Sequence, residues 1–315
     1  MRDGFDRNIY YLRLSVTDKC NLRCVYCMPE SGVTKLKHED ILSVEEISEI
    51  ARAAAACGIT KVRITGGEPL VRRGIVDICE RIAQTDGISE VCLTTNAILL
   101  PQFASKLKSA GVNRLNISLD SLNRQTYNEI TRVDALSEAL AGIDVALGAG
   151  FDALKINAVL IGGVNDSEIL DLLELTRTNN VNVRLIELMP IGECAEWAES
   201  RFISASSVLS LVPELREVGT DGVSKLYTLP DGHGTVGLIS PISSHFCPTC
   251  NRVRITCDGI LKPCLHSKDE INLRGLHGEE LEQAMYKAIY DKPLKHELDN
   301  GEASAAARNM NAIGG

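Results

Sequence analysis

YLRLSVTDKCNLRCVYC, residues 11–27, is the stretch of sequence that decides the fold. It starts as a strand in which apolar and polar residues alternate, and it ends in three cysteines, Cys20, Cys24 and Cys27. An iron–sulfur cube normally takes four cysteines, so three of them leave one iron able to bind a small molecule. Zinc is the main alternative, although it usually takes four ligands from paired Cys-x-x-Cys motifs. The spacing therefore favours an iron–sulfur site at the end of a strand.

Strands alternate with helices from this segment to about residue 188. Ser43 and Glu46 form a capping-box pattern at the start of the first helix, and Gly58 follows its end. Such alternation predicts parallel strands joined by right-handed crossovers. Six units of this kind predict an α/β fold, a partial (β/α)6 TIM-like barrel. The predicted strands are Tyr11–Thr17, Lys61–Thr65, Glu90–Thr95, Arg114–Asp120, Leu154–Leu160 and Asn182–Leu188.

Each predicted strand is apolar on one face and largely polar on the other. Because successive residues point to opposite faces, Arg13, Arg63 and Lys155 are expected inside the barrel. A buried charge without a partner is costly, and Asp120 could neutralise one of these cations. We therefore predict a polar, positively charged lumen that binds an anionic substrate.

Cys247, Cys250 and Cys264 form a second incomplete cysteine set near the other end of the chain. On its own, this set favours zinc, with His245 or His266 as the fourth ligand. In a chain that already carries the first set, a second three-cysteine iron–sulfur cluster is the stronger hypothesis. We expect it to lie in a C-terminal cluster-binding extension of the barrel.

Arg252 and Arg254 come directly after Cys250, at positions i and i+2 of a predicted strand, so both side chains point the same way. Arginine binds phosphate through paired hydrogen bonds. Together with the three lumen cations, they favour a polyphosphate as the ligand. We place the domain boundary near residue 215, with the barrel in residues 1–215 and the extension in residues 216–315.

The composition limits the class of protein. The chain has 315 residues, eleven cysteines and a formal net charge of −9. The negative charge argues against nucleic acid or an anionic membrane as a partner. No apolar run reaches the roughly 18 residues of a membrane span, and the N-terminus lacks the apolar stretch of a signal peptide. We therefore expect a cytoplasmic protein whose clustered cysteines bind metal.

CNLRCVYC, residues 20–27, resembles the cysteine signature of the radical S-adenosylmethionine (SAM) superfamily. Gly66-Gly67-Glu68-Pro69 resembles the Gly-Gly-Glu-Pro segment that follows the second strand in that superfamily. The resemblance implies a [4Fe-4S] cluster on Cys20, Cys24 and Cys27 whose open iron chelates SAM, and chemistry by a 5′-deoxyadenosyl radical. It also implies SAM contacts at Tyr26, Gly67, Ser118 and Met189.

Within that superfamily, the segments around Arg13, Arg63 and Cys247 and the terminal Gly314-Gly315 pair resemble the GTP 3′,8-cyclase family of molybdenum cofactor biosynthesis. This resemblance implies a second [4Fe-4S] cluster, on the second cysteine set, whose open iron binds the guanine ring. It also implies that the glycine pair inserts toward the active site. The GTP contacts implied are Arg13, Arg63, Thr94, Lys155, Arg252 and Arg254.

The reaction implied by this resemblance converts GTP to (8S)-3′,8-cyclo-7,8-dihydroguanosine 5′-triphosphate. No side chain stands out as a general acid or base. The partners implied are a reductant protein and the next enzyme of the pathway, cyclic pyranopterin monophosphate synthase, and a homodimer is compatible with the sequence. The alternatives are another radical SAM enzyme with an auxiliary cluster and a non-catalytic zinc- or cluster-binding module.

Two positions depart from the pattern of this family. Phe5-Asp6-Arg7 stands where Phe-Gly-Arg is usual, so Asp6 replaces glycine. Ala97 follows Thr94-Thr95-Asn96 at a position where glycine is also usual. Neither departure removes an expected ligand. The change at Ala97 is expected to affect a turn beside the nucleotide.

Overall fold

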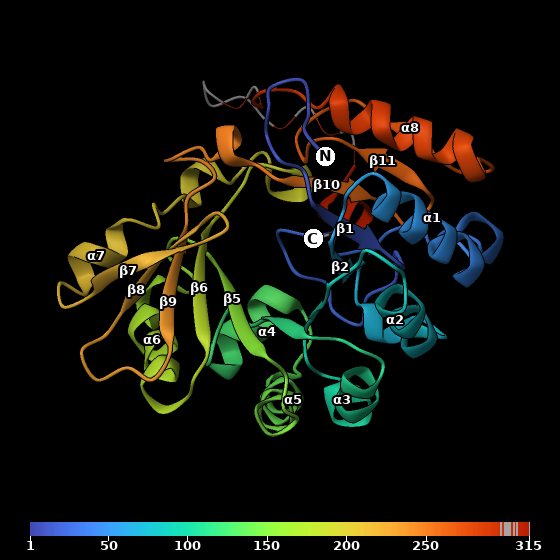
Figure 1. Cartoon of the computed structure of the whole chain (residues 1–315). Helices are drawn as coiled ribbons and strands as arrows, with labels where there is room; N and C mark the ends of the chain where they lie inside the picture. The colour runs from blue at the N-terminus through green and yellow to red at the C-terminus, as the bar shows by residue number, and fades with distance from the viewer. Residues whose placement is uncertain (297, 299–303, 305, 307, 315) are drawn as a thin grey trace.

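The computed structural model describes residues 1–296, 298, 304, 306 and 308–314. A single sheet runs through this part of the chain, in the order β12-β11-β10-β1-β2-β3-β4-β5-β6-β9-β8-β7 (Figure 1). The strands from β10 to β9 in this order are parallel, and the pairs at both ends are antiparallel. The strands are β1 (Tyr11–Ser15), β2 (Lys61–Thr65), β3 (Glu90–Thr95), β4 (Arg114–Ser118), β5 (Ala153–Leu160), β6 (Asn182–Glu187), β7 (Arg216–Asp221), β8 (Ser224–Thr228), β9 (Thr235–Ile239), β10 (Arg252–Ile255), β11 (Ile260–Lys262) and β12 (Ile271–Asn272).

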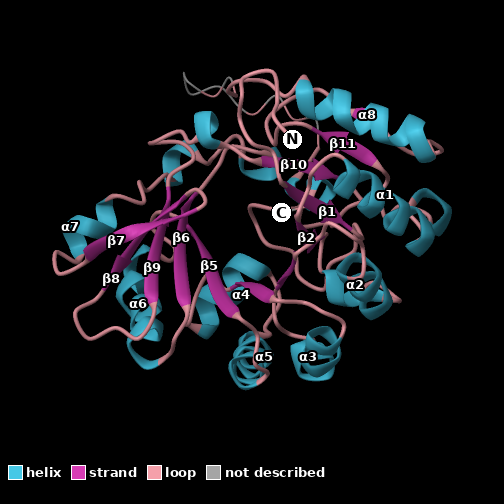
Figure 2. Ribbon diagram, viewed as in Figure 1, coloured by secondary structure: helices cyan, strands magenta, loops and turns pink. Residues whose placement is uncertain are grey.

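The sheet curves into an open barrel with helices on its outer side (Figure 2). The predicted α/β fold with a partial TIM-like barrel is therefore confirmed. In the described part of the chain, no helix is both long and apolar enough to cross a membrane. The helices are α1 (Val44–Ala56), α2 (Ile75–Ala83), α3 (Leu100–Ser109), α4 (Arg124–Thr131), α5 (Leu136–Gly148), α6 (Ile169–Thr178), α7 (Ser207–Leu211), α8 (Gly278–Tyr290) and α9 (Met310–Ile313).

The outer face of the sheet and the inner faces of the helices form the hydrophobic core. Leu12, Leu14 and Ile64 are fully buried there, as the strand pattern predicts. Burial of each such side chain stabilises the fold by about 1.5–3 kcal/mol. The capping box of α1 is present, since the Glu46 amide donates to Ser43 Oγ (3.1 Å) and the Ser43 amide donates to Glu46 Oε2 (2.7 Å). The core thus leaves the opposite, polar face of the sheet to line the lumen.

Strands from the C-terminal part of the chain extend the parallel sheet at both sides. β10 pairs with β1, and β9 pairs with β6. The sequence predicted a strand at Arg252 and Arg254 but not the place of β10 beside β1. One sheet thus holds strands from both sides of residue 215, and the division of the chain at that residue stays a prediction.

The two departures from the family pattern share one backbone feature. Asp6 has φ +64° and Ala97 has φ +69°, in the left-handed region that favours glycine. Aspartate tolerates this region better than alanine does. The Ala97 amide donates to Thr95 Oγ1 (3.1 Å), which helps to hold the turn. Ala97 therefore keeps the turn beside β3 in a glycine-like conformation at a cost in strain.

Glu187, at the end of β6, is fully buried and fixes two loops around the mouth of the barrel. Its Oε2 accepts from the amides of Ile242 (3.0 Å) and Ser243 (2.9 Å), and its Oε1 accepts from the amide of Ala205 (3.0 Å). These bonds hold the end of the strand that leads to Met189.

We expect Glu187→Gln to lower the free energy of unfolding by about 2–3 kcal/mol, because the new amide group points a donor at backbone donors. Denaturant unfolding of the variant measures this loss. Glu174→Gln is the matched control, since the Glu174 side chain is 60% exposed. Equal stability of the two variants would show that the buried carboxylate does not hold these loops.

Candidate active site

The Gly-Gly-Glu-Pro segment lies directly against the loop that carries the first cysteine set. The Gly67 amide donates to the carbonyl of Thr17 (2.8 Å), and the Glu68 amide donates to that of Lys19 (2.8 Å). A Cβ atom at Gly67 would lie 2.4 Å from the Lys19 carbonyl oxygen. Only glycine allows this approach, so the two segments form one surface at the carboxyl ends of β1 and β2.

The side chain of Glu68 holds this surface in place. Its buried carboxylate accepts from the amides of Leu70 (3.0 Å) and Asn96 (2.8 Å) and from Thr95 Oγ1 (2.8 Å). Burial raises the pKa of Glu68 to about 7, and these donors oppose that rise. Asn96 in turn donates to Asn21 Oδ1 (2.7 Å), which links β3 to the cysteine loop.

Cys20, Cys24 and Cys27 lie close enough together for their charges to interact. Burial raises the pKa of Cys20 to about 11, and the charge of Glu68 adds to this rise. Burial raises the pKa of Cys27 to about 12, and the charge of Cys20 adds to that rise. For Cys24, burial, Asp120 and the other two cysteines raise the pKa well above its usual value. Three thiolates in this position need a cationic metal centre to stabilise them. The donor set thus fits an iron–sulfur cluster.

The described residues contain no group of three or more His, Cys, Asp or Glu side chains arranged to hold one metal ion. The cysteines of an iron–sulfur cube bind different irons, so they need not converge on one point. The spacing of both cysteine sets is therefore compatible with iron–sulfur clusters.

Tyr26, within the first cysteine set, contacts the segments that follow β4 and β6, next to Ser118 and Met189. Tyr26 packs against Leu188, the neighbour of Met189, and its hydroxyl donates to Asp120 Oδ2 (2.6 Å). Ser118 ends β4 on the polar face of the sheet. Burial raises the pKa of Asp120 to about 6. Asp120 also accepts from the Val159 amide (2.8 Å), so its contacts are with Tyr26 and the backbone instead of the expected lumen cation.

The expected substrate cations lie side by side across the sheet. Arg13 pairs in register with Arg63 on β2 and with Arg254 on β10. Burial lowers the pKa of Arg13 to about 10; Tyr11 opposes this effect, and the charges of Arg63 and Arg252 add to it. Burial also lowers the pKa of Arg254 well below its usual value, and Arg13 adds to the effect. The structure thus gathers arginines from three strands into one lumen.

Many polar atoms of this lumen are buried without a hydrogen-bond partner. Such atoms are rare in folded proteins, and each one calls for water or a ligand. They include both donors and acceptors, which suits a ligand that is anionic at one end and hydrogen-bonding elsewhere. The atoms on the lumen face are Tyr11 Oη, Arg13 Nε, Arg63 Nε, Thr65 Oγ1, Thr94 Oγ1, Asn116 Oδ1 and Nδ2, and Asn157 Oδ1.

Arg184 is a lumen residue that the sequence analysis missed. It stands mid-strand in β6, two residues after Asn182, and Val183 and Leu185 beside it are fully buried in the core. The alternation that predicted Lys155 would have found it. Arg184 Nη2 and Lys155 Nζ both bind Asp221 Oδ2, the former at 2.5 Å. Burial lowers the pKa of Lys155 to about 8, with Arg184 contributing.

The second cysteine set lies at the amino end of β10. The charges of Cys250 and Cys264 act on Cys247, so the three thiols are neighbours. Burial raises the pKa of Cys250, but Lys292 and Arg252 outweigh it and lower the pKa. Arg7 Nη1 donates to the Cys247 carbonyl (2.9 Å), which ties the N-terminus to this set. The donor set fits a second cluster.

The histidines proposed as zinc ligands have other contacts. His245 Nδ1 bonds with the Pro241 carbonyl (2.8 Å), and His266 Nδ1 bonds with Ser304 Oγ (3.1 Å). Burial lowers the pKa of His266 to about 3, with His296 and Arg254 contributing. Thus the Nδ1 atom of neither ring is directed at the cysteines.

The C-terminal segment enters the lumen. Arg254 Nη1 donates to the Gly314 carbonyl (2.7 Å), and the backbone of Asn311 hydrogen-bonds to Cys27 and lowers its pKa. Gly314 lies beside Ser15 and Thr65, while Gly315 lies outside the described residues. The segment thus contacts both the first cysteine set, at Cys27, and the lumen arginines, at Arg254.

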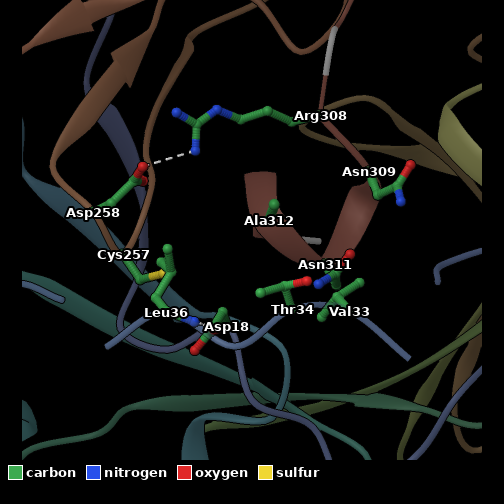
Figure 3. Close-up of a pocket in the computed structure, with 10 residues that line it drawn as sticks. All are labelled: Asp18, Val33, Thr34, Leu36, Cys257, Asp258, Arg308, Asn309, Asn311 and Ala312. Carbon is green, nitrogen blue, oxygen red and sulfur yellow. Dashed lines mark hydrogen bonds and ion pairs between the residues drawn. The ribbon is translucent and has the colours of Figure 1, made fainter. Parts of the chain in front are cut away.

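A cavity of about 170 Å³ lies between this segment and the loop after the first cysteine set (Figure 3). Arg308 spans its edge to Asp258 (2.8 Å) and also binds Glu270 (3.0 Å). Asp18 and Asn311 each present a buried oxygen without a partner. Arg308 therefore holds the C-terminal segment over a polar space at the mouth of the barrel.

Comparison with known proteins agrees with this geometry. Residues 14–176 match the radical SAM superfamily, and residues 181–298 match Molybdenum Cofactor Synthesis C. The chain therefore belongs to the radical SAM superfamily.

Within that superfamily, full-length relatives define a narrower family. The GTP 3′,8-cyclase of Alkaliphilus oremlandii is 49% identical and that of Alkaliphilus metalliredigens is 50% identical, each over 100% of both chains. The chain belongs to the family of these GTP 3′,8-cyclases.

Solved structures share the fold at lower sequence identity. Streptococcus suis SuiB bound to S-adenosylmethionine has a TM-score of 0.63 and 16% identity, over 93% of this chain and 68% of SuiB. Native anSMEcpe with bound AdoMet has a TM-score of 0.56 and 14% identity, over 89% of this chain and 83% of that chain. These similarities support the partial barrel.

Gly314→Ala should release the C-terminal segment from the lumen. A Cβ atom there would lie 2.7 Å from Thr65 Oγ1 and 2.9 Å from Ser15 Cβ, and the residue has φ +85°. Left-handed backbone costs alanine about 1–2 kcal/mol, so amide exchange in α9 should accelerate about tenfold or more. Hydrogen–deuterium exchange measures this. Gly148→Ala, whose Cβ would meet no atom within 4 Å, is the control and should leave α9 unchanged. Unchanged exchange in both variants would contradict the close fit of Gly314.

Proposed function

We propose that the chain catalyses the reaction for which its relatives are named, the 3′,8-cyclisation of GTP. The observation that carries this proposal is a lumen with several buried cations and unpartnered polar atoms between two sets of three cysteines. The cations suit a triphosphate, and the two sets suit one metal centre at each end of the ligand. Family membership supports the same substrate.

In this proposal, Cys20, Cys24 and Cys27 would hold the cluster that binds SAM. When bound, the cluster and SAM supply a 5′-deoxyadenosyl radical that removes hydrogen from ribose C3′ of the substrate. Gly67 would contact the methionine part of SAM, and its lack of a side chain is what lets its backbone lie against the Lys19 carbonyl in the cysteine loop. Tyr26, Ser118 and Met189 would contact the rest of the SAM molecule.

At the other end, Cys247, Cys250 and Cys264 would hold a second cluster beside the guanine ring. Arg252 lies with its guanidinium 5.2 Å from the centre of the Phe246 ring, which orients it beside this set. Arg13, Arg63 and Arg254 point into the space between the two sets and would bind the triphosphate. Thr94 and Lys155 complete the group on the next strands.

The side chains in this site act mainly by position and charge. Fixing ribose C3′ near guanine C8 replaces an encounter in solution with a reaction inside one bound molecule. The C-terminal segment accepts a hydrogen bond from Arg254 at the Gly314 carbonyl, and in this proposal it would help to shield the bound substrate from water. The reductant protein, transfer to cyclic pyranopterin monophosphate synthase, the homodimer and the cytoplasmic location stay predictions.

Anaerobic incubation of the reconstituted protein with GTP, SAM and a reductant tests the proposed function. One hydrogen leaves C3′, and one electron and one proton are added later, so the product has the mass of GTP but a new retention time. We expect this product together with 5′-deoxyadenosine. Cys24→Ser should abolish both. Formation of 5′-deoxyadenosine without a cyclised nucleotide would instead favour another radical SAM reaction.

Metal analysis tests the second cluster separately. We expect about eight irons per reconstituted chain and about four in the triple variant Cys247→Ser, Cys250→Ser, Cys264→Ser. Cys57→Ser changes a buried cysteine outside both sets and should keep about eight. Zinc bound by the second set in place of iron would refute the two-cluster proposal.

A further inference from the structure

In the described part of the chain, Asp221 is the one carboxylate that forms ion pairs with Lys155 on β5 and Arg184 on β6. It ends β7, and its Oδ2 accepts from both Lys155 Nζ and Arg184 Nη2. The side chains of Lys155 and Arg184 are only 6% and 8% exposed, whereas that of Asp221 is 37% exposed. The Asp221 carboxylate therefore comes from a partly exposed position, whereas Lys155 and Arg184 are buried in the barrel.

The element that carries Asp221 differs from the rest of the barrel. β7 is the edge strand of the sheet, and its residues before Asp221 are exposed. Its pairing with β8 shifts register between Glu217 and Gly219. Gly222, in the turn that follows Asp221, has φ +64°. Asp221 thus reaches the lumen from the turn of a hairpin and not from the packed parallel core.

Carboxylate and phosphate oxygens compete for the same donors. Lysine and arginine bind both through short charge-assisted hydrogen bonds. A buried cation without a partner is costly, so Lys155 and Arg184 need an anion whenever substrate is away. Asp221 can give up this position at lower cost than the cations can, because it is already partly in contact with water.

Arg13 and Arg63 show the contrast within the same lumen. Each has a buried Nε without a hydrogen-bond partner, and neither forms an ion pair within the described part of the chain. They therefore offer hydrogen bonds to an incoming polyphosphate at once. The charges of Lys155 and Arg184 are matched by Asp221, so both cations can face a phosphate together only after Asp221 leaves.

We propose that Asp221 occupies the place of a substrate phosphate and must be displaced before an anion binds between Lys155 and Arg184. This inference rests on the proposed function, in which the lumen binds GTP. Every anion that reaches Lys155 and Arg184 must displace the same carboxylate. A nucleoside triphosphate offsets that cost through its contacts with the other lumen cations, whereas orthophosphate has no further contacts. Asp221 thus excludes small anions and yields to the substrate.

Equilibrium dialysis under anaerobic conditions, with labelled GTP and separately with labelled orthophosphate, tests this role. In Asp221→Asn the dissociation constants of both should fall by about tenfold, because both are relieved of the same competitor. Asp221→Ser should shift both in the same direction and guards against a new contact made by the amide. Asp231→Asn changes net charge equally at a side chain that is 88% exposed, and it should change neither constant.

Two results would overturn the proposal. Weaker GTP binding in Asp221→Asn and Asp221→Ser would mean that the carboxylate orients the cations for substrate. Unchanged binding of both anions would mean that it does not stand where a phosphate binds. If the wild-type protein binds no GTP, the proposed function fails, while the change in orthophosphate affinity still decides the role of Asp221.

Discussion

Like charges on neighbouring strands are the constraint around which this molecule is built. Arg13, Arg63 and Arg254 stand in register across β2, β1 and β10. Two unit charges about 5 Å apart, the spacing of adjacent strands, repel by about 3 kcal/mol at an effective dielectric constant of 20. The apolar outer face of the same strands must therefore supply the stability that the inner face lacks. An enzyme that needed only a packed barrel would fill this space with branched apolar side chains.

The chain compensates the cations of this lumen in two ways and leaves a third group of them without a partner. Arg254 hydrogen-bonds to the carbonyl of Gly314, a neutral partner that brings the C-terminal segment into the lumen. Lys155 and Arg184 share Asp221, an anion from the edge of the sheet. Arg13 and Arg63 keep a buried Nε without a partner, which a ligand can satisfy. The lumen is thus only partly neutralised by the protein itself.

The sequence predicted the parts of this arrangement that follow from strand periodicity. Alternation within a strand placed Arg13, Arg63 and Lys155 on the inner face, and the same rule applied to β6 would have added Arg184. Asp221 could not be found in this way, because β7 is an exposed edge strand without an apolar face. The position of β10 beside β1 depends on pairing between residues about 240 apart in sequence, which no local pattern encodes. Ala97 is a position where the structure explains the sequence pattern. Glycine is usual there because the backbone has a φ of +69°, which the sequence does not show.

The pairing of β10 with β1 also explains how two distant cysteine sets can serve one lumen. The strands are parallel, with Tyr11 opposite Arg252. Cys20 follows the carboxyl end of β1, whereas Cys250 precedes the amino end of β10. The two cysteine sets therefore lie at opposite ends of these parallel strands. A strand of five residues spans about 17 Å at 3.3 Å per residue. Arg13 and Arg254 stand within that span. A ligand held by both cysteine sets must therefore extend across the arginines. This favours an elongated, multiply charged molecule over a small anion.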